Sequence, residues 1–177
     1  MRVLSPDLET LGREPGCVVL SIGYAVADTD GGEVTESGIL YPNVQEQIDH
    51  GMHVCADTIR WWVAQSPEAQ RGTFIEGNHQ EPVKQALVTL SRVFQPCSFV
   101  TGYGSTFDVG IIEATHRRFG VPTPWNYRGV LCLRTMCLTT GTVIDRTTGD
   151  KHNSEHDAMN QAYAFLECYL KLQRVVR

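Results

Sequence analysis

Two carboxylates near the start of the chain, Asp7 and Glu9, have a spacing that suggests chemistry. If residues 3–9 form a β-strand, alternate side chains emerge on the same face, so the two carboxylates lie close together. Such like charges repel each other unless a cation lies between them. Because Mg²⁺ and Mn²⁺ prefer oxygen ligands, the pair indicates a divalent-metal site that stays open to a substrate. The same tripeptide also fits a solvated strand end, so the interpretation depends on residues further along the chain.

Three later residues have side chains that would complete such a site. Asp108 ends the glycine-rich run 102–108 and opens a helix, and glycines at a strand end let the backbone approach a ligand closely. Five residues turn a helix by about 140°, so His152 and Asp157 converge only if His152 lies on the preceding loop. Both acids also have structural interpretations. A carboxylate in a first helical turn is favoured by the helix dipole, and Ser154 with Asp157 resembles a capping box.

Four carboxylates and one histidine meet the needs of two-metal phosphodiester hydrolysis. Two cations about 3.5 to 4 Å apart hold the attacking water and the leaving 3′ oxygen at the same time. Because histidine titrates near neutral pH, His152 is expected to take the proton from the attacking water, with His156 as its rival for that role. The expected metal ligands are Asp7, Glu9, Asp108 and Asp157.

The hydrophobic pattern predicts the strands that must position these residues. Residues 17–27 alternate with period two, and Gly31-Gly32 forms a turn before residues 33–41, so three antiparallel strands are expected to open the fold. Pro6 is awkward in the first strand, because a proline cannot donate to a sheet ladder and usually marks an edge or an irregularity. Two further short apolar strands are predicted, at 98–101 and 130–133.

Helices are predicted to cover the sheet. They start near Asp57, Pro82, Asp108 and Ser154, with a polar link over 72–80 after the first. The first helix carries Trp61 and Trp62, which point about 100° apart, so one is expected to enter the core while the other lies nearer the surface. The simplest interpretation of both is packing, because large aromatic side chains are mostly buried. The alternative is that one stacks on a nucleic-acid base, a contact worth about 1 to 3 kcal/mol.

The composition predicts one soluble domain over residues 1–177, with 42% hydrophobic and 20% charged residues. No apolar run approaches the roughly 20 residues of a membrane span, and the six cysteines form no CxxC pair, so a cytoplasmic protein without a membrane partner is expected. The formal net charge of -5 gives no overall attraction to a polyanion, so bound cations and local basic groups must hold a nucleic acid. The basic residues considered for phosphate contacts are Arg117, Arg118, Arg128, Arg134 and Lys151.

These motifs resemble those of a known enzyme family. Asp7-x-Glu9-Thr10, the Gly-x-Gly-x-x-Phe-Asp run ending at Asp108, and His152-x-x-x-x-Asp157 are similar to the three exonuclease motifs of the DEDDh branch of the DnaQ-like, RNase H-fold 3′-5′ exonucleases. The three motifs extend over residues 7–157, which is almost the whole chain. Relatives tend to have apolar residues where this chain has Ser5-Pro6.

Two further segments indicate which members of this family the chain resembles most. With Trp61-Trp62-x-x-Gln65-Ser66 and Pro124-Trp125, the chain looks most like phage exonucleases of the exodeoxyribonuclease A type and RNase AS-like exoribonucleases. If the gene is a phage gene, the resemblance implies the cytoplasm of a bacterial host as its location. Relatives commonly dimerise, so a homodimer is one expected state that this sequence does not specify.

The resemblance implies an α/β fold with an RNase H-like mixed five-stranded sheet flanked by helices, and two Mg²⁺ or Mn²⁺ ions. It implies release of nucleoside 5′-monophosphates from the 3′ end of single-stranded DNA or RNA, with DNA slightly favoured. It also implies that Thr10 and Leu11 line the pocket of the terminal nucleotide, and Trp61 and Phe107 are the aromatic residues expected to contact substrate. Two alternatives stay open: a binding or scaffolding module of the same fold without turnover, and a domain in which metal is purely structural.

Overall fold

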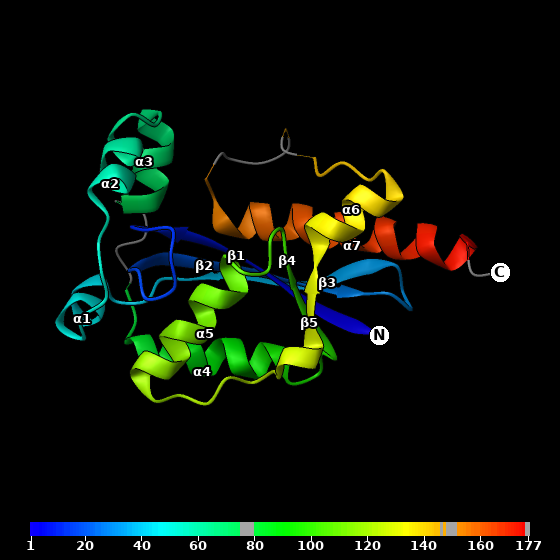
Figure 1. Ribbon diagram of the computed structural model, residues 1–177, viewed down its shortest axis with the longest axis horizontal. Coiled ribbons are helices and arrows are strands. Elements are labelled where there is room, and N and C mark those ends of the chain that lie inside the picture. The colour runs from blue at the N-terminus through cyan, green and yellow to red at the C-terminus, as the bar shows by residue number, and fades with distance from the viewer. Residues whose placement is uncertain (75–79, 146, 148–151, 176–177) are drawn as a thin grey trace.

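A mixed sheet of five strands forms the centre of the structure (Figure 1). The computed structural model describes residues 1–74, 80–145, 147 and 152–175. The strands β1, β2 and β3 run antiparallel, whereas β4 and β5 join β1 in parallel, and their spatial order is β3-β2-β1-β4-β5. Their bounds are β1 (Arg2–Thr10), β2 (Val19–Asp28), β3 (Glu33–Leu40), β4 (Phe99–Gly102) and β5 (Val130–Cys132). The predicted mixed five-stranded α/β fold is confirmed.

Helices cover both faces of this sheet. Their bounds are α1 (Val44–Asp49), α2 (Ala56–Val63), α3 (Pro67–Phe74), α4 (Val83–Phe94), α5 (Asp108–Phe119), α6 (Leu133–Thr140) and α7 (Ser154–Val175). A 3-10 turn over Tyr127–Gly129 leads into β5. In Figure 1, α4 and α5 lie on one face, α6 and α7 lie on the other, and α2 with α3 stands at the end where β1 finishes. Within the parts of the chain that the structure describes, none of these helices has the length and apolar composition that a bilayer crossing needs.

Alternation along β1 sends its side chains to two different cores. Leu4 and Leu8 pack with apolar residues of α4 and α5, whereas Val3 packs with apolar residues of α6 and α7. Asp7 and Glu9 have the same parity as Val3, so they emerge on the α7 face close to the end of the strand. The period of the sequence therefore decides which helix meets the two carboxylates.

Pro6 does not interrupt β1. The parallel ladder to β4 consists of Val3 with Phe99 and Leu4 with Val100, so it has ended before the proline. The missing N–H of Pro6 therefore costs no hydrogen bond on that side of the strand. The irregularity of β1 lies instead at Glu9 and Thr10, where the register to β2 shifts. This shift lies beside the carboxylates.

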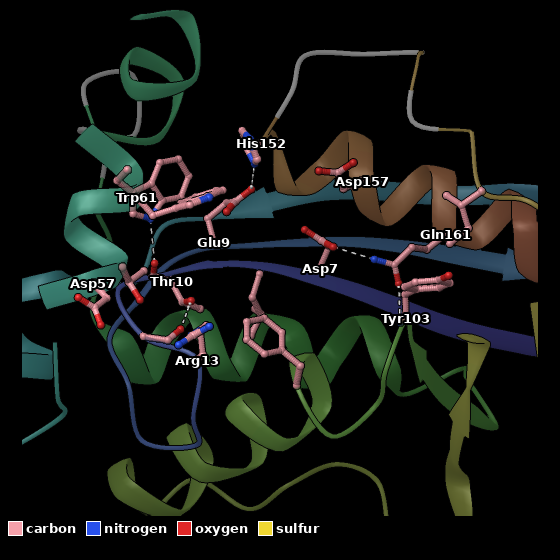
Figure 2. A pocket seen from close by; sticks show the side chains of 16 residues that line it. Asp7, Glu9, Thr10, Arg13, Asp57, Trp61, Tyr103, His152, Asp157 and Gln161 are labelled. Carbon is pink, nitrogen blue, oxygen red and sulfur yellow. Dashed lines mark hydrogen bonds and ion pairs between the residues drawn. The ribbon is translucent and has the colours of Figure 1, made fainter. Parts of the chain in front are cut away.

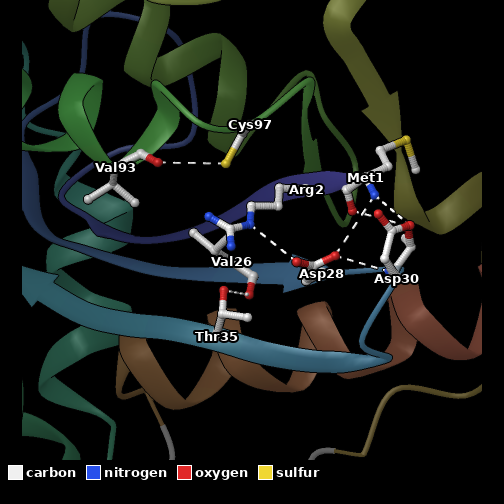
Figure 3. A network of polar contacts seen from close by, with 9 residues as sticks. Met1, Arg2, Val26, Asp28, Asp30, Thr35, Val93 and Cys97 are labelled. Atoms are coloured by element: carbon white, nitrogen blue, oxygen red, sulfur yellow. Dashed lines mark hydrogen bonds and ion pairs between the residues drawn. The ribbon is translucent and has the colours of Figure 1, made fainter.

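The opposite end of β1 carries an ion-pair network (Figure 3). The amino group of Met1 lies 2.9 Å from an Asp30 carboxylate oxygen, and Arg2 Nε lies 3.2 Å from Asp28 Oδ2. Exposed pairs of this kind contribute about 0 to 1 kcal/mol each, so they join the N-terminus to the β2-β3 hairpin without dominating stability. At this end of the sheet, the carboxylates of Asp28 and Asp30 are paired with cationic groups of Arg2 and Met1.

Three helices were missed from the sequence. α1, α3 and α6 have six, eight and eight residues, too short to display a long hydrophobic period. The predicted polar link over 72–80 is wrong at its start, because α3 continues to Phe74, and residues 75–79 lie outside the described part of the chain.

The helix starts predicted near Asp57 and Ser154 agree with α2 and α7, and the structure shows which residues cap these helices. Cys55 is the N-cap residue of α2, without a capping hydrogen bond from its side chain, and Asp57 lies in the first turn, where it pairs with Arg60. At the start of α7, the Asn153 side chain accepts hydrogen bonds from the N–H groups of Glu155 and His156, so the predicted Ser154 capping box is wrong. An asparagine side chain can cap a helix as well as a serine can. Here the Ser154 hydroxyl hydrogen-bonds to Ser21 instead.

Candidate active site

Three carboxylates converge where β1 ends beneath α7 (Figure 2). Oxygen atoms of Asp7, Glu9 and Asp157 all lie within 4.8 Å of one another. Among the residues that the structure describes, this is the one group of three or more side chains arranged to hold a metal ion. β1 supplies the first two from one face, and the first turn of α7 supplies the third.

Gly23 and Ser21 explain how α7 comes so close to the sheet. Gly23 pairs with Asp7 across the β1-β2 ladder, and a Cβ atom at this position would lie 1.9 Å from the Ser154 carbonyl oxygen. Ser21 pairs with Glu9, and its hydroxyl lies 2.9 Å from the Ser154 hydroxyl in a hydrogen bond. Only glycine leaves room here, so the first turn of α7 rests directly on β2. Asp157 is brought to the other two acids by this contact.

The electrostatics of the cluster fit a divalent cation. The pKa of Glu9 is raised to about 9, first by burial and then by the negative charges of Asp157 and Asp108. Full ionisation of the cluster is therefore unfavourable until positive charge is added. Because all three donors are carboxylate oxygens, the donor set suits a hard ion such as Mg²⁺ or Mn²⁺ better than a soft one.

Asp108 lies next to this group but not in it. Its side chain is 5% exposed, and it does not line the pocket described below. A Cβ atom on Gly102 would lie 3.3 Å from Asp108 Oδ2, so the glycine at the end of β4 leaves room for the carboxylate. Burial raises the pKa of Asp108 to about 7, against the lowering effect of N–H groups of Asp108 and Leu8 and of the Arg134 charge. The structure thus brings three of the four predicted ligands together and places the fourth within electrostatic reach of Glu9.

His152 stands at the edge of the cluster on the loop before α7, as the sequence predicted. Its Nδ1 atom lies 3.8 Å from Glu9 Oε1, and its φ of 62° is in the left-handed region that few non-glycine residues adopt. The rings of Trp61 and Trp62 meet the imidazole edge-on, with centroid distances of 5.0 and 5.6 Å. His156, the predicted rival, lines a different hollow together with Met159. The geometry therefore favours His152.

The cluster lies in a pocket of about 700 Å³, within the usual range for ligand sites. Thr10, Trp61 and Phe107, three of the four residues predicted to bind substrate, line it. Trp61 is 45% exposed and Trp62 is 2% exposed, which confirms that one tryptophan enters the core and the other stays near the surface. The Thr10 hydroxyl donates to the Gly12 carbonyl at 2.6 Å, so it shapes the loop after β1.

Leu11 does not line this pocket. Its side chain packs against the apolar cluster that contains Val18 and Leu87. Its backbone N–H donates to Val18, and its carbonyl accepts from Cys55. Leu11 is thus a packing residue beneath the loop, although its backbone lies close to the site.

The pocket also contains residues that the sequence did not indicate. These are Arg13, Asp57, Thr58, Tyr103, Ile144 and Gln161, together with the site neighbours Leu8 and Gly12; Trp62, which the sequence analysis did consider, lines the pocket as well. A signal for Gln161 was present, because it follows Asp157 by four residues and therefore shares its face of α7. Arg13 follows the Asp-x-Glu motif closely, but no period or motif marks it as a pocket residue.

Of the five basic residues considered for phosphate contacts, two have partners away from the pocket. Arg117 lies 3.9 Å from Glu113, and Arg128 stacks on Tyr127 at 5.5 Å. Arg134 stacks on Tyr103 at 4.9 Å, which brings its charge near the pocket. Lys151 lies outside the described residues, and Arg118 does not line the pocket.

Three solved nuclease structures share this fold. The nuclease domain of 3′hExo, a DEDDh family member bound to rAMP, shares 13% identity at a TM-score of 0.60, covering 96% of this chain and 92% of that one. Cell-death related nuclease 4 (CRN-4) shares 12% identity at a TM-score of 0.63, covering 96% and 64%. The zinc-bound complex of E. coli ExoI with single-stranded DNA shares 18% identity at 0.61, covering 99% of this chain and 41% of that one. At these identities the likeness shows the fold.

The family is shown by sequence. A model of the 3′-5′ exoribonuclease Rv2179c-like domain matches residues 3–169, so this chain belongs to that family and is a 3′-5′ exonuclease. No curated protein sequence matches the chain. The predicted class of enzyme and the DEDDh-type fold are therefore confirmed.

Proposed function

We propose that the chain removes nucleotides one at a time from the 3′ end of a single-stranded nucleic acid and releases nucleoside 5′-monophosphates. The proposal is carried by the convergence of the Asp7, Glu9 and Asp157 oxygens within 4.8 Å in an open pocket. Residues 1–177 act as one exonuclease domain in this proposal, with two Mg²⁺ or Mn²⁺ ions.

Asp7, Glu9 and Asp157 would hold the ions, with Asp108 as the fourth carboxylate. When bound, the ions supply Lewis-acid stabilisation of the attacking and leaving oxygens of the phosphodiester. The buried setting of Glu9 and Asp108 makes their negative charge costly without such ions, so a bound cation would displace the proton that Glu9 keeps in its absence. The raised pKa values also predict that the site binds metal more weakly as the pH falls.

His152 would accept the proton of the attacking water. Its place on the loop before α7 lets the imidazole approach the cluster, and the edges of Trp61 and Trp62 hold the ring there. Proton transfer of this kind contributes about 10² to 10⁴ in rate. The adjacent Glu9 carboxylate stabilises the imidazolium that results.

The terminal nucleotide would occupy the part of the pocket between Trp61, Thr10 and Phe107. The exposed face of Trp61 offers a stacking surface for a base. Arg13, on the same wall, is a cation that can meet a phosphate. Leu11 would support this wall from below.

We propose RNA as the preferred polymer, because the family is one of exoribonucleases. The slight preference for DNA that the sequence suggested came with the resemblance to phage exodeoxyribonucleases, and that resemblance stays a prediction. The homodimer and the cytoplasmic location, in a bacterial host if the gene is a phage gene, also stay predictions. Light scattering of the purified protein measures the oligomeric state directly.

Matched single-stranded RNA and DNA oligomers, labelled at the 3′ end, test this function. With Mn²⁺ we expect labelled mononucleotide from the first turnover, faster from RNA, and none with EDTA. Oligomers labelled at the 5′ end should shorten stepwise. Binding without mononucleotide release, unaffected by EDTA, would instead indicate a nucleic-acid-binding module without turnover.

A further inference from the structure

Gln161 is a buried polar side chain inside the pocket that the exonuclease motifs do not include. It lies one turn after Asp157 on α7 and is 6% exposed. Its neighbours on the sheet side of α7 are apolar, namely Ala158, Ala162 and Phe165. A buried amide costs free energy unless its donors and acceptor are all used, so its presence on an apolar helix face requires a reason.

Both ends of the Gln161 amide are used. Its Nε2 atom donates to Asp7 Oδ1 at 2.7 Å, and its Oε1 atom accepts from the N–H of Tyr103 at 3.0 Å (Figure 2). A backbone N–H can only donate, so Oε1 must face Tyr103 and Nε2 must face Asp7. The loop after β4 therefore fixes which end of the amide meets the carboxylate.

The contact extends to the surface of the protein. Arg134 Nη2 donates to the Tyr103 carbonyl at 3.1 Å, and its guanidinium stacks on the Tyr103 ring. Tyr103 is thereby held between Arg134 on α6 and Gln161 on α7. The amide that meets Asp7 is rigidly supported on its far side.

A second buried glutamine provides an internal comparison. The Gln47 amide bonds only backbone groups, accepting from the Val19 N–H at 2.8 Å and donating to the Val19 carbonyl at 2.8 Å. Gln47 thus joins α1 to β2. Gln161 differs because one of its two partners is Asp7, a member of the carboxylate cluster.

We propose that Gln161 is a positioning residue for the metal centre. It holds the Asp7 carboxylate turned toward Glu9 and Asp157, so that the three oxygen donors are arranged before any ion binds. The inference rests on the proposed function, since it assigns Gln161 to the same site. Side chains that orient metal ligands typically contribute about 10- to 100-fold in metal affinity or activity.

Binding of Mn²⁺ alone, without nucleic acid, tests the proposal by calorimetry on the folded protein. Gln161→Met keeps the length of the side chain but removes both hydrogen bonds, and we expect Mn²⁺ affinity to fall by about 10- to 100-fold. Its activity should need correspondingly more Mn²⁺ for half of its maximal rate. Gln161→Glu keeps the shape but turns an oxygen toward Asp7, so its Mn²⁺ affinity should fall at least as far.

Two matched controls use two other glutamines, Gln47 and Gln173. Gln47→Met should lower the melting temperature but leave Mn²⁺ affinity within about twofold, and Gln173→Met, at an exposed position on the same helix, should change neither. The proposal is overturned if folded Gln161→Met binds Mn²⁺ as the wild type does, or if Gln161→Glu binds it more tightly. Failure of the proposed function would appear separately, as a wild-type protein that binds Mn²⁺ but releases no mononucleotide.

Discussion

The two walls of the pocket are built by different means. The α7 wall, which carries Asp157 and Gln161, is fixed to the sheet by hydrogen bonds and by the close approach at Gly23. The α2 wall, which carries Trp61, is held through aromatic edges and through hydrogen bonds to the end of β1 and the loop after it, among them one from Trp62 Nε1 to the Thr10 carbonyl at 2.9 Å. The first wall orders charged groups and the second presents apolar surface.

This difference matches the demands of the chemistry. Ion ligands must be placed within a few tenths of an ångström, which directional hydrogen bonds and a glycine contact can achieve. A base can stack on an aromatic ring whatever its sequence, so the α2 wall needs surface more than exact geometry. Changes to the α7 wall should therefore act mainly on the rate, whereas changes to the α2 wall should act mainly on substrate binding or stability.

The largest effect is expected for Asp157→Asn on the α7 wall. The variant loses a charge that the ions need, so activity should fall by more than the roughly 10² to 10⁴ that a lost general base costs. Its melting temperature without metal should not fall, because one repulsive charge beside Glu9 is gone. Asp49→Asn, at an exposed acid remote from the pocket, is the control and should keep full activity.

His152→Ala tests the point where the two walls meet. The variant should fold and bind Mn²⁺, but cut about 10² to 10⁴ times more slowly. Single-turnover rates on an RNA oligomer measure this. Turnover close to that of the wild type would move the role to His156 or to solvent.

Gly23→Ala should separate the α7 wall from the sheet. The added methyl group would lie 1.9 Å from the Ser154 carbonyl oxygen, so the first turn of α7 has to move. Because a shift of about 1 Å at a reacting centre can cost about 10² in rate, we expect a loss of that size in kcat with unchanged secondary structure by circular dichroism. Gly72→Ala, where nothing lies within 4 Å of the added atom, is the matched control.

The two tryptophans of the α2 wall should have different roles, one in stability and the other in RNA binding. Trp62→Ala removes a buried ring and should lower the free energy of unfolding by about 3 to 5 kcal/mol. Trp61→Ala should unfold like the wild type but bind RNA with an affinity weakened by the roughly 1 to 3 kcal/mol of a stacking contact. Denaturant unfolding and fluorescence anisotropy measure the two. Equal effects of the two substitutions on stability and on RNA affinity would contradict these separate roles. Val63→Ala, at a residue that is 72% exposed, is the control and should change neither quantity.

The smallest effect is the pH dependence of stability that comes from Glu9, the carboxyl group between the two walls. In the metal-free protein the pKa of Glu9 is about 9, against an ordinary value of 4.5, so the folded state keeps a proton that the unfolded chain has already lost. The contribution of Glu9 to stability therefore falls as the pH rises from about 4.5 to about 9. Glu9→Gln should remove this decline and raise the melting temperature at pH 8 by a few degrees, as calorimetry with EDTA would show.

Much of this arrangement could be predicted from local patterns. Period two in β1 placed Asp7 and Glu9 on one face, and the step from His152 to Asp157 required the histidine to lie on a loop. The 100° between Trp61 and Trp62 predicted one buried and one exposed ring. Each of these follows from the geometry of a single strand or helix.

What could not be predicted depends on contacts between elements distant in the sequence. The sequence around Gly23 does not indicate that α7 packs on this glycine. The sequence around Asn153 does not indicate that the Ser154 hydroxyl hydrogen-bonds to Ser21. The separation of Asp108 from the other three carboxylates likewise depends on how α5 packs against β1. Gln161 is an intermediate case. Its spacing from Asp157 predicts that both residues share a face of α7, but the sequence does not predict its hydrogen bond with Tyr103.

The most direct measurement is anomalous diffraction from crystals soaked in Mn²⁺. We expect a manganese peak in contact with oxygens of Asp7, Glu9 and Asp157, and loss of that peak in Asp157→Asn. Manganese bound elsewhere, with the three carboxylates left as they are without metal, would contradict this expectation.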